Sequence, residues 1–219
     1  HTYSTNPKKI KDGQHPKVAN LLQSTQEYYD IMKKFGYGDK EIIVDEWGAS
    51  HSGFANWDDV PEVIYRDNEY HPAFYAKLVH DYIKELHERQ IPISKMMICL
   101  SGQHDLTKDF EGYRSFFTLN HFPKPIYNGY AMMAKLGDGL LHYSTESADK
   151  NIGVIPTTDS DGNYKIVIYY MHENMNIKLE NCRVRLNIQN IKGNYKVRHY
   201  RIDHHYSNSL TKWIEEGRP

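Results

Sequence analysis

Amphipathic helical segments alternate with short apolar runs over the first 137 residues, and this order limits the fold more than any other feature. The predicted elements are a helix over 17–35, a strand over 41–45, a helix over 73–89, a strand over 95–100 and a helix over 125–136. The helices carry apolar residues at helical spacing, and both strand-like runs lack the polar alternation of a half-exposed strand. Such an order indicates a parallel sheet with crossover helices. We therefore predict that residues 1–137 form an α/β unit.

Residues 138–219 are predicted to form a second, all-β domain. Its expected strands are short and lie at 152–155, 164–170, 182–188 and 195–202. In the third of these, Val184, Leu186 and Ile188 alternate with polar residues, a period of two that is typical of a strand with one buried face. Asp, Gly and Asn at 161–163 supply one of the turns. The pattern predicts an antiparallel β-sandwich.

The first strand ends in a group of residues suited to chemistry. The run Ile42-Ile43-Val44 is followed at once by Asp45, Glu46, Trp47 and Gly48. In parallel α/β folds the functional side chains lie at the carboxyl ends of the strands, so Glu46 is expected at the mouth of a site. A carboxylate beside an aromatic ring is the arrangement that a sugar-cleaving enzyme needs. An acid at a strand end also serves simply to cap the next turn, so the run alone leaves both interpretations open.

Composition excludes several other classes of protein. The 219 residues carry 27 basic and 28 acidic side chains, so no basic surface is available to attract nucleic acid. No apolar stretch approaches the ~18 residues of a membrane-spanning helix, and we expect no membrane partner. Cys99 and Cys182 are too few for a disulfide framework. The 13 histidines lack the spacing of a zinc site, and no glycine-rich phosphate loop is present, so we expect neither a metal nor a cofactor.

Four stretches together resemble the C-terminal half of glycoside hydrolase family 39, which contains β-xylosidases and α-L-iduronidases. They are His1-Thr2-Tyr3; Ile43-Val44-Asp45-Glu46-Trp47; Phe117-Thr118-Leu119-Asn120 with Pro123-Lys124-Pro125, Tyr130 and Lys135-Leu136-Gly137-Asp138; and Tyr200-Arg201-Ile202-Asp203 with Ser207-Asn208, Trp213, Gly217 and Pro219. The resemblance spans nearly the whole chain. It departs from the family at the end of the second strand, where Cys99-Leu100-Ser101-Gly102 replaces an aromatic-rich stretch, and at Tyr206, where a histidine is expected.

The resemblance implies both a fold and a reaction. The fold would be the C-terminal portion of a (β/α)8 TIM barrel over residues 1–137, with about strands 7–8 and their flanking helices, followed by a β-sandwich over 138–219. The activity would be retaining hydrolysis of an O-glycosyl bond, with Glu46 as the nucleophile at the end of the seventh strand. Retaining enzymes also need a second carboxylic acid as general acid/base. The resemblance places that acid upstream of His1.

Five further residues are predicted to contact the sugar. They are His1, Tyr3, Trp47, Trp57 and His104. The first two match the motif that ends the sixth barrel strand of the family, and the third follows the nucleophile. Trp57 and His104 lie in loops after the strand ends, where barrel enzymes form their subsites. The Trp57 ring serves either to stack on a sugar or to anchor its own loop. Asp45 precedes Glu46, so its side chain is expected on the other face of the strand, as a structural hydrogen-bond acceptor.

The resemblance also has consequences for the chain by itself. Two strands cannot close an eight-stranded barrel, so the chain is expected to be a fragment that lacks the N-terminal half of the barrel and is inactive alone. It should expose apolar surface and associate, as in a homo-oligomer. The expected substrate is a glycoside or oligosaccharide, and a secreted or periplasmic location follows from family habit only. The alternatives are a non-catalytic carbohydrate-binding or structural β-sandwich module with a barrel remnant, and an unrelated α/β enzyme.

Overall fold

Three parallel strands form the first sheet, in the order β1 (Thr2–Thr5), β2 (Ile42–Ser50) and β3 (Ile93–Ile98). The computed structural model describes residues 1–101, 106–147, 149–191 and 193–218. The parallel pairing of β2 with β3 confirms the α/β pattern predicted for the first part of the chain. The strand β2 is longer than predicted, because it continues through Glu46 and beyond instead of stopping before it.

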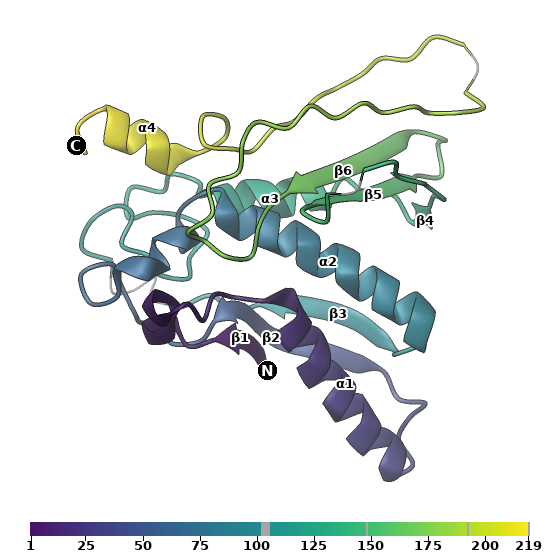
Figure 1. The fold of residues 1–219 in the computed structure, drawn as a ribbon, viewed down its shortest axis with the longest axis horizontal. Coiled ribbons are helices and arrows are strands. Elements are labelled where there is room, and N and C mark those ends of the chain that lie inside the picture. The colour runs from purple at the N-terminus through teal and green to yellow at the C-terminus, as the bar shows by residue number, and fades with distance from the viewer. Residues whose placement is uncertain (102–105, 148, 192, 219) are drawn as a thin grey trace.

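Three helices pack on one face of this sheet. They are α1 (Val18–Lys34), α2 (Tyr70–Arg89) and α3 (Pro125–Met133), and each overlaps a predicted helix. Figure 1 shows α2 and α3 above the parallel sheet, and α1 packs beside α2 through a 2.7 Å hydrogen bond between the Thr25 and Tyr82 hydroxyls. None of the helices within the described ranges has the length and apolar character that a membrane crossing needs.

The other face of the parallel sheet carries no helix among the described residues. Val44 of β2 and Met96 of β3 pack into the core beneath the helices. Their neighbours Ile43 and Met97 point the opposite way, because side chains alternate along a strand, and both are exposed. We call this surface the open face of the parallel sheet.

A β-bulge interrupts the pairing of β2 with β3. Val44 pairs with Met96 and Trp47 pairs with Ile98, so β2 has one residue more than β3 between these two pairs. The extra residue falls at the Asp45-Glu46 pair. Bulges of this kind bend a strand, redirect its side chains and are over-represented next to active sites.

The second sheet is antiparallel and has the order β4 (Gly139–Leu140), β5 (Ile152–Thr158) and β6 (Tyr164–Tyr170). Strands β5 and β6 confirm two of the predicted strands. The turn between them is built as the sequence indicates: Asp159 Oδ1 accepts a hydrogen bond from the backbone nitrogen of Asn163 at 2.9 Å, and Gly162 has a left-handed φ of +76°.

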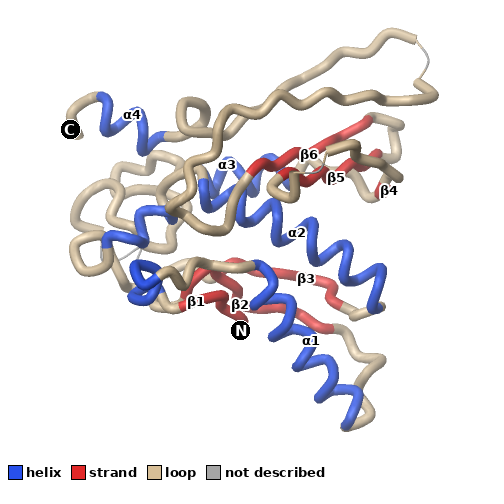
Figure 2. Tube along the Cα trace, viewed as in Figure 1, coloured by secondary structure: helices blue, strands red, loops and turns tan. Residues whose placement is uncertain are grey.

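The predicted strands at 182–188 and 195–202 are wrong. Among the described residues after 138, one antiparallel sheet forms and no second sheet packs on it as a sandwich requires. Both segments have no regular secondary structure and run out from the body as loop in Figure 2. Their alternating apolar residues have no sheet to pack against, so Val184, Leu186 and Ile188 are all more than 40% exposed. An alternating pattern predicts which face of a strand is apolar, but a strand forms only where a neighbouring backbone supplies hydrogen bonds.

Three short helical elements were not predicted. They are η1 (Pro7–Asp12), η2 (Pro61–Arg66) and α4 (Ser209–Glu215). Local sequence explains two of the starts. Asn6 accepts a hydrogen bond from the backbone nitrogen of Lys8 before η1, and Asn208 accepts one from Thr211 at the start of α4. Such short elements have too few residues to show a helical period.

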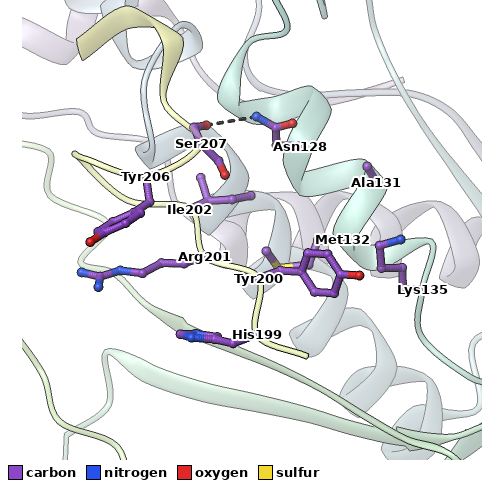
Figure 3. Close-up of a pocket in the computed structure, with 10 residues that line it drawn as sticks. All are labelled: Asn128, Ala131, Met132, Lys135, His199, Tyr200, Arg201, Ile202, Tyr206 and Ser207. Atoms are coloured by element: carbon purple, nitrogen blue, oxygen red, sulfur yellow. Dashed lines mark hydrogen bonds between the residues drawn. The ribbon is translucent and has the colours of Figure 1, made fainter. Parts of the chain in front are cut away.

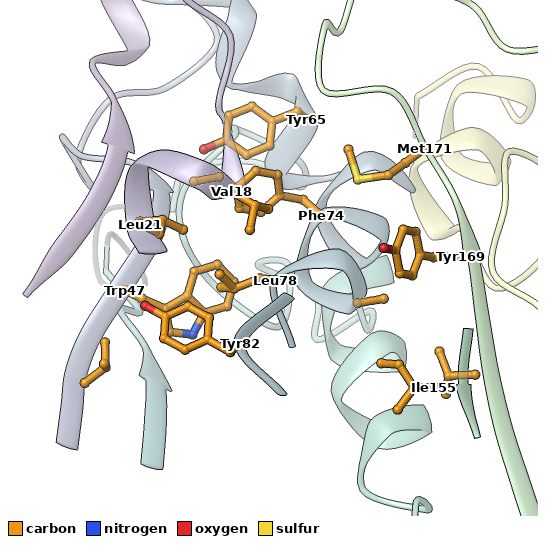
Figure 4. Close-up of a cluster of buried hydrophobic side chains, with 14 of the residues drawn as sticks. Val18, Leu21, Trp47, Tyr65, Phe74, Leu78, Tyr82, Ile155, Tyr169 and Met171 are labelled. Carbon is orange, nitrogen blue, oxygen red and sulfur yellow. The ribbon is translucent and has the colours of Figure 1, made fainter. Parts of the chain in front are cut away.

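The helix α2 lies at the centre of the core, between the two sheets. Its residues Phe74 and Leu78 contact one cluster that also contains Trp47 of β2 and Ile155 and Tyr169 of the antiparallel sheet (Figure 4). The predicted domain boundary at residue 138 falls between α3 and β4. Because both sheets share this core through α2, the division of the chain into two independent domains stays a prediction.

His71 at the start of α2 is expected to make stability depend on pH. Burial, reinforced by the Arg66 guanidinium, lowers the pKa of His71 to about 3, whereas an unfolded histidine titrates near its ordinary pKa of about 6.5. Below pH 6.5 the unfolded state therefore binds a proton that the folded state excludes. The free energy of unfolding should fall by about 2 kcal/mol from pH 7 to pH 5 through this residue.

Urea unfolding at the two pH values measures this effect. In a His71→Gln variant, which does not titrate, the loss of stability between pH 7 and pH 5 should be smaller than in the wild type by that amount. The matched control is His142→Gln, because His142 is exposed and its replacement should leave the pH dependence unchanged. Equal pH dependence in the wild type and His71→Gln would contradict the prediction.

Candidate active site

Glu46 lies on the open face of the parallel sheet. Its neighbour Trp47 points to the other face, where the indole stacks on Tyr75 of α2 with ring centroids 5.5 Å apart, and side chains alternate between the faces of a strand. The Glu46 side chain is 26% exposed. Its carboxylate is therefore partly shielded from water but accessible to a ligand that approaches the open face.

The structure brings the predicted residue His1 next to this carboxylate and places Tyr3 against Gly48, two residues further along β2. His1 Nδ1 lies 2.9 Å from Glu46 Oε2. Tyr3 pairs with Gly48 in the register of β1 and β2, and its ring lies across that glycine, because a Cβ atom on residue 48 would sit 2.8 Å from a ring carbon of Tyr3. The N-terminal segment and the end of β2, far apart in the sequence, thus meet at one edge of the sheet.

Asp45 does not follow the strict alternation predicted for it. Its carboxylate Oδ1 lies 3.5 Å from the His1 backbone nitrogen, so both Asp45 and Glu46 contact the same residue. The bulge at this pair accounts for the difference, since the extra residue removes the regular alternation between Val44 and Trp47. The side chain of Asp45 is 57% exposed, more than twice the fraction of Glu46.

Cys99 approaches Glu46 from the neighbouring strand. It follows β3 directly, and its backbone nitrogen donates to the Trp47 carbonyl at 3.0 Å. Burial, reinforced by the Glu46 carboxylate, raises the pKa of its thiol. His1 therefore contacts the Glu46 carboxylate from the β1 side, and the end of β3 lies on the other side of β2.

Arg114 adds a buried positive charge that the sequence analysis missed. The side chain is 8% exposed, and its guanidinium carbon lies 5.1 Å from the centre of the Tyr3 ring. Its Nε donates to Ser101 Oγ at 3.1 Å, whereas its Nη1 is buried without a hydrogen-bond partner in the described part of the chain. The one available signal was its position in the loop region after the second strand, and no motif marked it there.

Comparison with known proteins identifies the family. The model of the glycosyl hydrolases of family 39 matches residues 3–219. The chain belongs to this family. A comparison with curated protein sequences finds no match. Among solved structures, the chain is similar to a family 39 β-xylosidase from Caulobacter crescentus, with 14% sequence identity and a TM-score of 0.48. The similarity covers 74% of this chain but 30% of that one, so the chain spans less than a third of the length of the structure it matches.

Trp47 of this family 39 chain does not line the open face, contrary to prediction. The side chain is fully buried and forms a column of stacked rings with Tyr75 and Tyr130, whose own centroids are 4.1 Å apart. An alternating strand cannot present Glu46 and Trp47 to the same ligand. Trp47 therefore packs the core behind the carboxylate, and its ring is not available to a sugar.

Trp57 lies in a separate hollow of about 490 Å³, which it shares with Asp58, Phe110 and Trp213. Its backbone nitrogen donates to the Glu111 carbonyl at 2.9 Å. The structure records no contact between Trp57 and Glu46 within the described ranges, and its role in sugar binding stays a prediction. The other predicted loop residue, His104, lies outside the described residues.

A larger hollow of about 560 Å³ lies between α3 and the segment 199–207, away from Glu46. Figure 3 shows Asn128 of α3 donating to the Ser207 carbonyl at one end, at 3.0 Å. Tyr200 lies near Lys135 in the same view, with the ammonium 5.2 Å from the ring centre. None of the predicted site residues lines this hollow.

The buried guanidinium of Arg66 holds the loop that follows β2. Arg66 is fully buried and donates to Ser50 Oγ and to the carbonyls of His51 and Ala55, all within 3.2 Å. It therefore fixes the chain as it leaves β2, a few residues beyond Glu46. Across the described ranges, no three His, Cys, Asp or Glu side chains are grouped closely enough to hold a metal ion.

Proposed function

We propose that this chain is the C-terminal part of a retaining glycoside hydrolase in which Glu46 is the nucleophile. The observation that supports the proposal best is the placement of Glu46. It is a partly shielded carboxylate on the open face of a parallel sheet, with His1 Nδ1 2.9 Å from one of its oxygens. A carboxylate held in one orientation is suited to attack an electrophilic carbon, because the contacts reduce the conformational freedom lost on reaction.

The reaction would run in two displacements. In the first, a Glu46 oxygen attacks the anomeric carbon of the sugar, the glycosidic bond breaks and the departing oxygen takes a proton from the general acid. In the second, water attacks the same carbon, the general base takes a proton from that water, and the bond to Glu46 breaks. The sugar leaves with its original anomeric configuration and the carboxylate is restored.

The second carboxylic acid is proposed to come from the N-terminal half of the barrel. Retaining enzymes place the two carboxyl groups about 5–5.5 Å apart, across a face such as the open face that carries Glu46. Three parallel strands do not close a barrel, so further strands must supply the opposite wall. We refer to the chain together with those strands as the full-length protein, and the 219-residue chain alone is expected to be inactive.

His1 and Tyr3 are proposed to contact the sugar bound at Glu46. The His1 imidazole lies 2.9 Å from the proposed nucleophile, and the Tyr3 ring presents an apolar face with a polar tip, which suits a sugar ring. Trp57 and His104 are also proposed to contact the sugar. Xylosides and iduronides are the proposed substrates, because family 39 contains enzymes of both types.

A covalent trap tests the proposed role of Glu46. The full-length protein is first assayed with aryl xylosides, iduronides and arabinosides, and the 2-deoxy-2-fluoro analogue of the sugar that reacts is then used to trap the glycosyl-enzyme. Mass spectrometry of the digested protein should place the label on the peptide that contains Glu46. A label on another carboxylate, or a product with inverted anomeric configuration, would show that the assignment is wrong. Sugar binding without turnover of any of these substrates would favour the non-catalytic carbohydrate-binding module.

A further inference from the structure

Tyr3 lies on the same face of the parallel sheet as Glu46. In the pairing of β1 with β2, Thr2 is opposite Trp47, and both of these side chains are buried. The next pair is Tyr3 with Gly48, so the Tyr3 side chain points the opposite way, to the open face. Glu46 is two residues before Gly48 and shares that face. The ring of Tyr3 is therefore placed to border a sugar that is bound at Glu46.

The guanidinium of Arg114 lies against this ring. Its central carbon is 5.1 Å from the centre of the Tyr3 ring. Its Nε donates to Ser101 Oγ at 3.1 Å, and the Ser101 backbone nitrogen donates to the Arg114 carbonyl at 2.7 Å. The guanidinium also packs against Gly53, where a Cβ atom would lie 2.2 Å from Nη2. One side chain thus contacts Tyr3 of β1 and the segments that follow β2 and β3.

The charge of Arg114 is buried without an acid beside it. The residue is 8% exposed, and it forms no ion pair with any residue that the structure describes. Its Nη1 is buried too and has no acceptor in the same part of the chain. A buried cation without a carboxylate costs free energy, and its attraction to an aromatic face is stronger where water is excluded. The Tyr3 ring therefore stabilises this charge, and the charge in turn restrains the ring.

We propose that Arg114 is a positioning residue for Tyr3: the buried guanidinium holds the ring in one orientation on the open face before a sugar binds. This inference rests on the proposed function, in which Tyr3 contacts the sugar at Glu46. A ring that is already fixed loses little conformational freedom when the ligand arrives, so binding is tighter. The proposal also gives a reason for keeping an unpaired charge inside the protein at this edge of the sheet.

The contact is tested first without any measurement of activity. Urea unfolding of the full-length protein is compared for the wild type, Arg114→Gln, Tyr3→Leu and the double variant. Each single substitution removes the contact, so the second should cost less stability when the first is already present. Strictly additive effects would overturn the proposal, because two side chains that stabilise each other do not act independently.

Turnover by the full-length protein tests the positioning role itself. Arg114→Gln should raise KM for the preferred aryl glycoside by about tenfold, the scale of a desolvated contact between a cation and a ring. Its kcat should stay within a few-fold of the wild type, because Glu46 is untouched and the lost interaction serves binding. Arg114→Lys keeps a cation near the ring and should restore most of the wild-type KM. An unchanged KM in Arg114→Gln would overturn the proposal.

Two further variants make the result specific. Lys135→Gln removes a cation that lies 5.2 Å from the centre of the Tyr200 ring, in the hollow away from Glu46, and KM should not change. An equal rise in this variant would count against the proposal. Ser101→Ala removes the hydrogen bond at Nε but keeps the charge, and KM should rise several-fold, the scale of one lost hydrogen bond. If Arg114→Gln does not fold, Ser101→Ala decides the question, and an unchanged KM there overturns the proposal.

The two proposals fail in different ways. If Tyr3→Leu leaves KM unchanged, Tyr3 does not contact the sugar, and the proposed function is wrong at that residue together with the positioning role built on it. If Tyr3→Leu raises KM but Arg114→Gln does not, the sugar contact stands and the positioning role of Arg114 fails.

Discussion

Turnover by the full-length protein is expected to fall by at least about 10³-fold when Glu46 is replaced by Gln, on the scale seen when other enzymes lose a catalytic nucleophile. An amide has no negative charge and cannot form the glycosyl ester, so both displacements stop. The fold should be retained. The side chain is partly exposed, and its ion pair with His1 is worth about 0–1 kcal/mol at such a site.

The neighbouring acid gives a matched control for this prediction. Asp45→Asn removes one carboxylate from the same bulge, but Asp45 is the more exposed of the two and is not the proposed nucleophile. Its turnover should stay within a few-fold of the wild type. Activity assays with the preferred aryl glycoside, together with circular dichroism of each variant, separate loss of chemistry from loss of structure. Survival of turnover in Glu46→Gln would remove the central residue of the proposed mechanism.

The second large effect is on stability, at the buried ion pair between Lys124 and Asp67. The two charged atoms are 2.5 Å apart and neither side chain is exposed. Asp67 also accepts a hydrogen bond from the Gly112 backbone at 2.6 Å, and Lys124 donates to the Tyr113 carbonyl at 3.1 Å. Lys124→Met should lower the free energy of unfolding by about 3–5 kcal/mol, because it leaves the Asp67 carboxylate buried without its partner.

An exposed pair of the same type provides the comparison. Lys108 lies 3.1 Å from Asp58, and the two side chains are 50% and 73% exposed. Lys108→Met should cost no more than about 1 kcal/mol. Urea unfolding of the full-length protein measures both variants. A double variant, Lys124→Met with Asp67→Leu, should recover part of the lost stability because no charge is left unpaired. Equal effects at the buried and the exposed pair would contradict the prediction.

The alternation of helices and strands could be predicted because each element carries its own period. Apolar spacing located α1 and α2, and Gly36 marked the end of the first of them. The strand-end position of Glu46 predicted a neighbour from an adjacent strand, and His1 Nδ1 lies 2.9 Å from its carboxylate. The helices and parallel strands could be predicted because they depend on local pattern, whereas the role of Glu46 stays a prediction.

The errors arose where structure depends on distant partners. The apolar alternation at Val184 to Ile188 predicts a strand, but no described segment pairs with it. The position of Trp47 directly after Glu46 predicts a site residue, whereas alternation sends its ring into the core. Arg114 is brought to Tyr3 by a loop, and the sequence holds no signal for a contact between residues so far apart. The bulge could not be predicted from the sequence either. It exists because β2 has one residue more than β3 between two paired positions, and that pairing is seen only in the folded structure.

The two faces of β2 have a consequence for how this chain is able to change over evolution. The ring column of Trp47, Tyr75 and Tyr130 anchors the strand to α2 and α3 from behind, and the residues that face a ligand lie on the other side. Substitutions on the ligand side therefore need not disturb the packing that keeps the strand in place. Under the proposed function, substitutions that change sugar preference would therefore cost little stability, because different residues keep Glu46 in position.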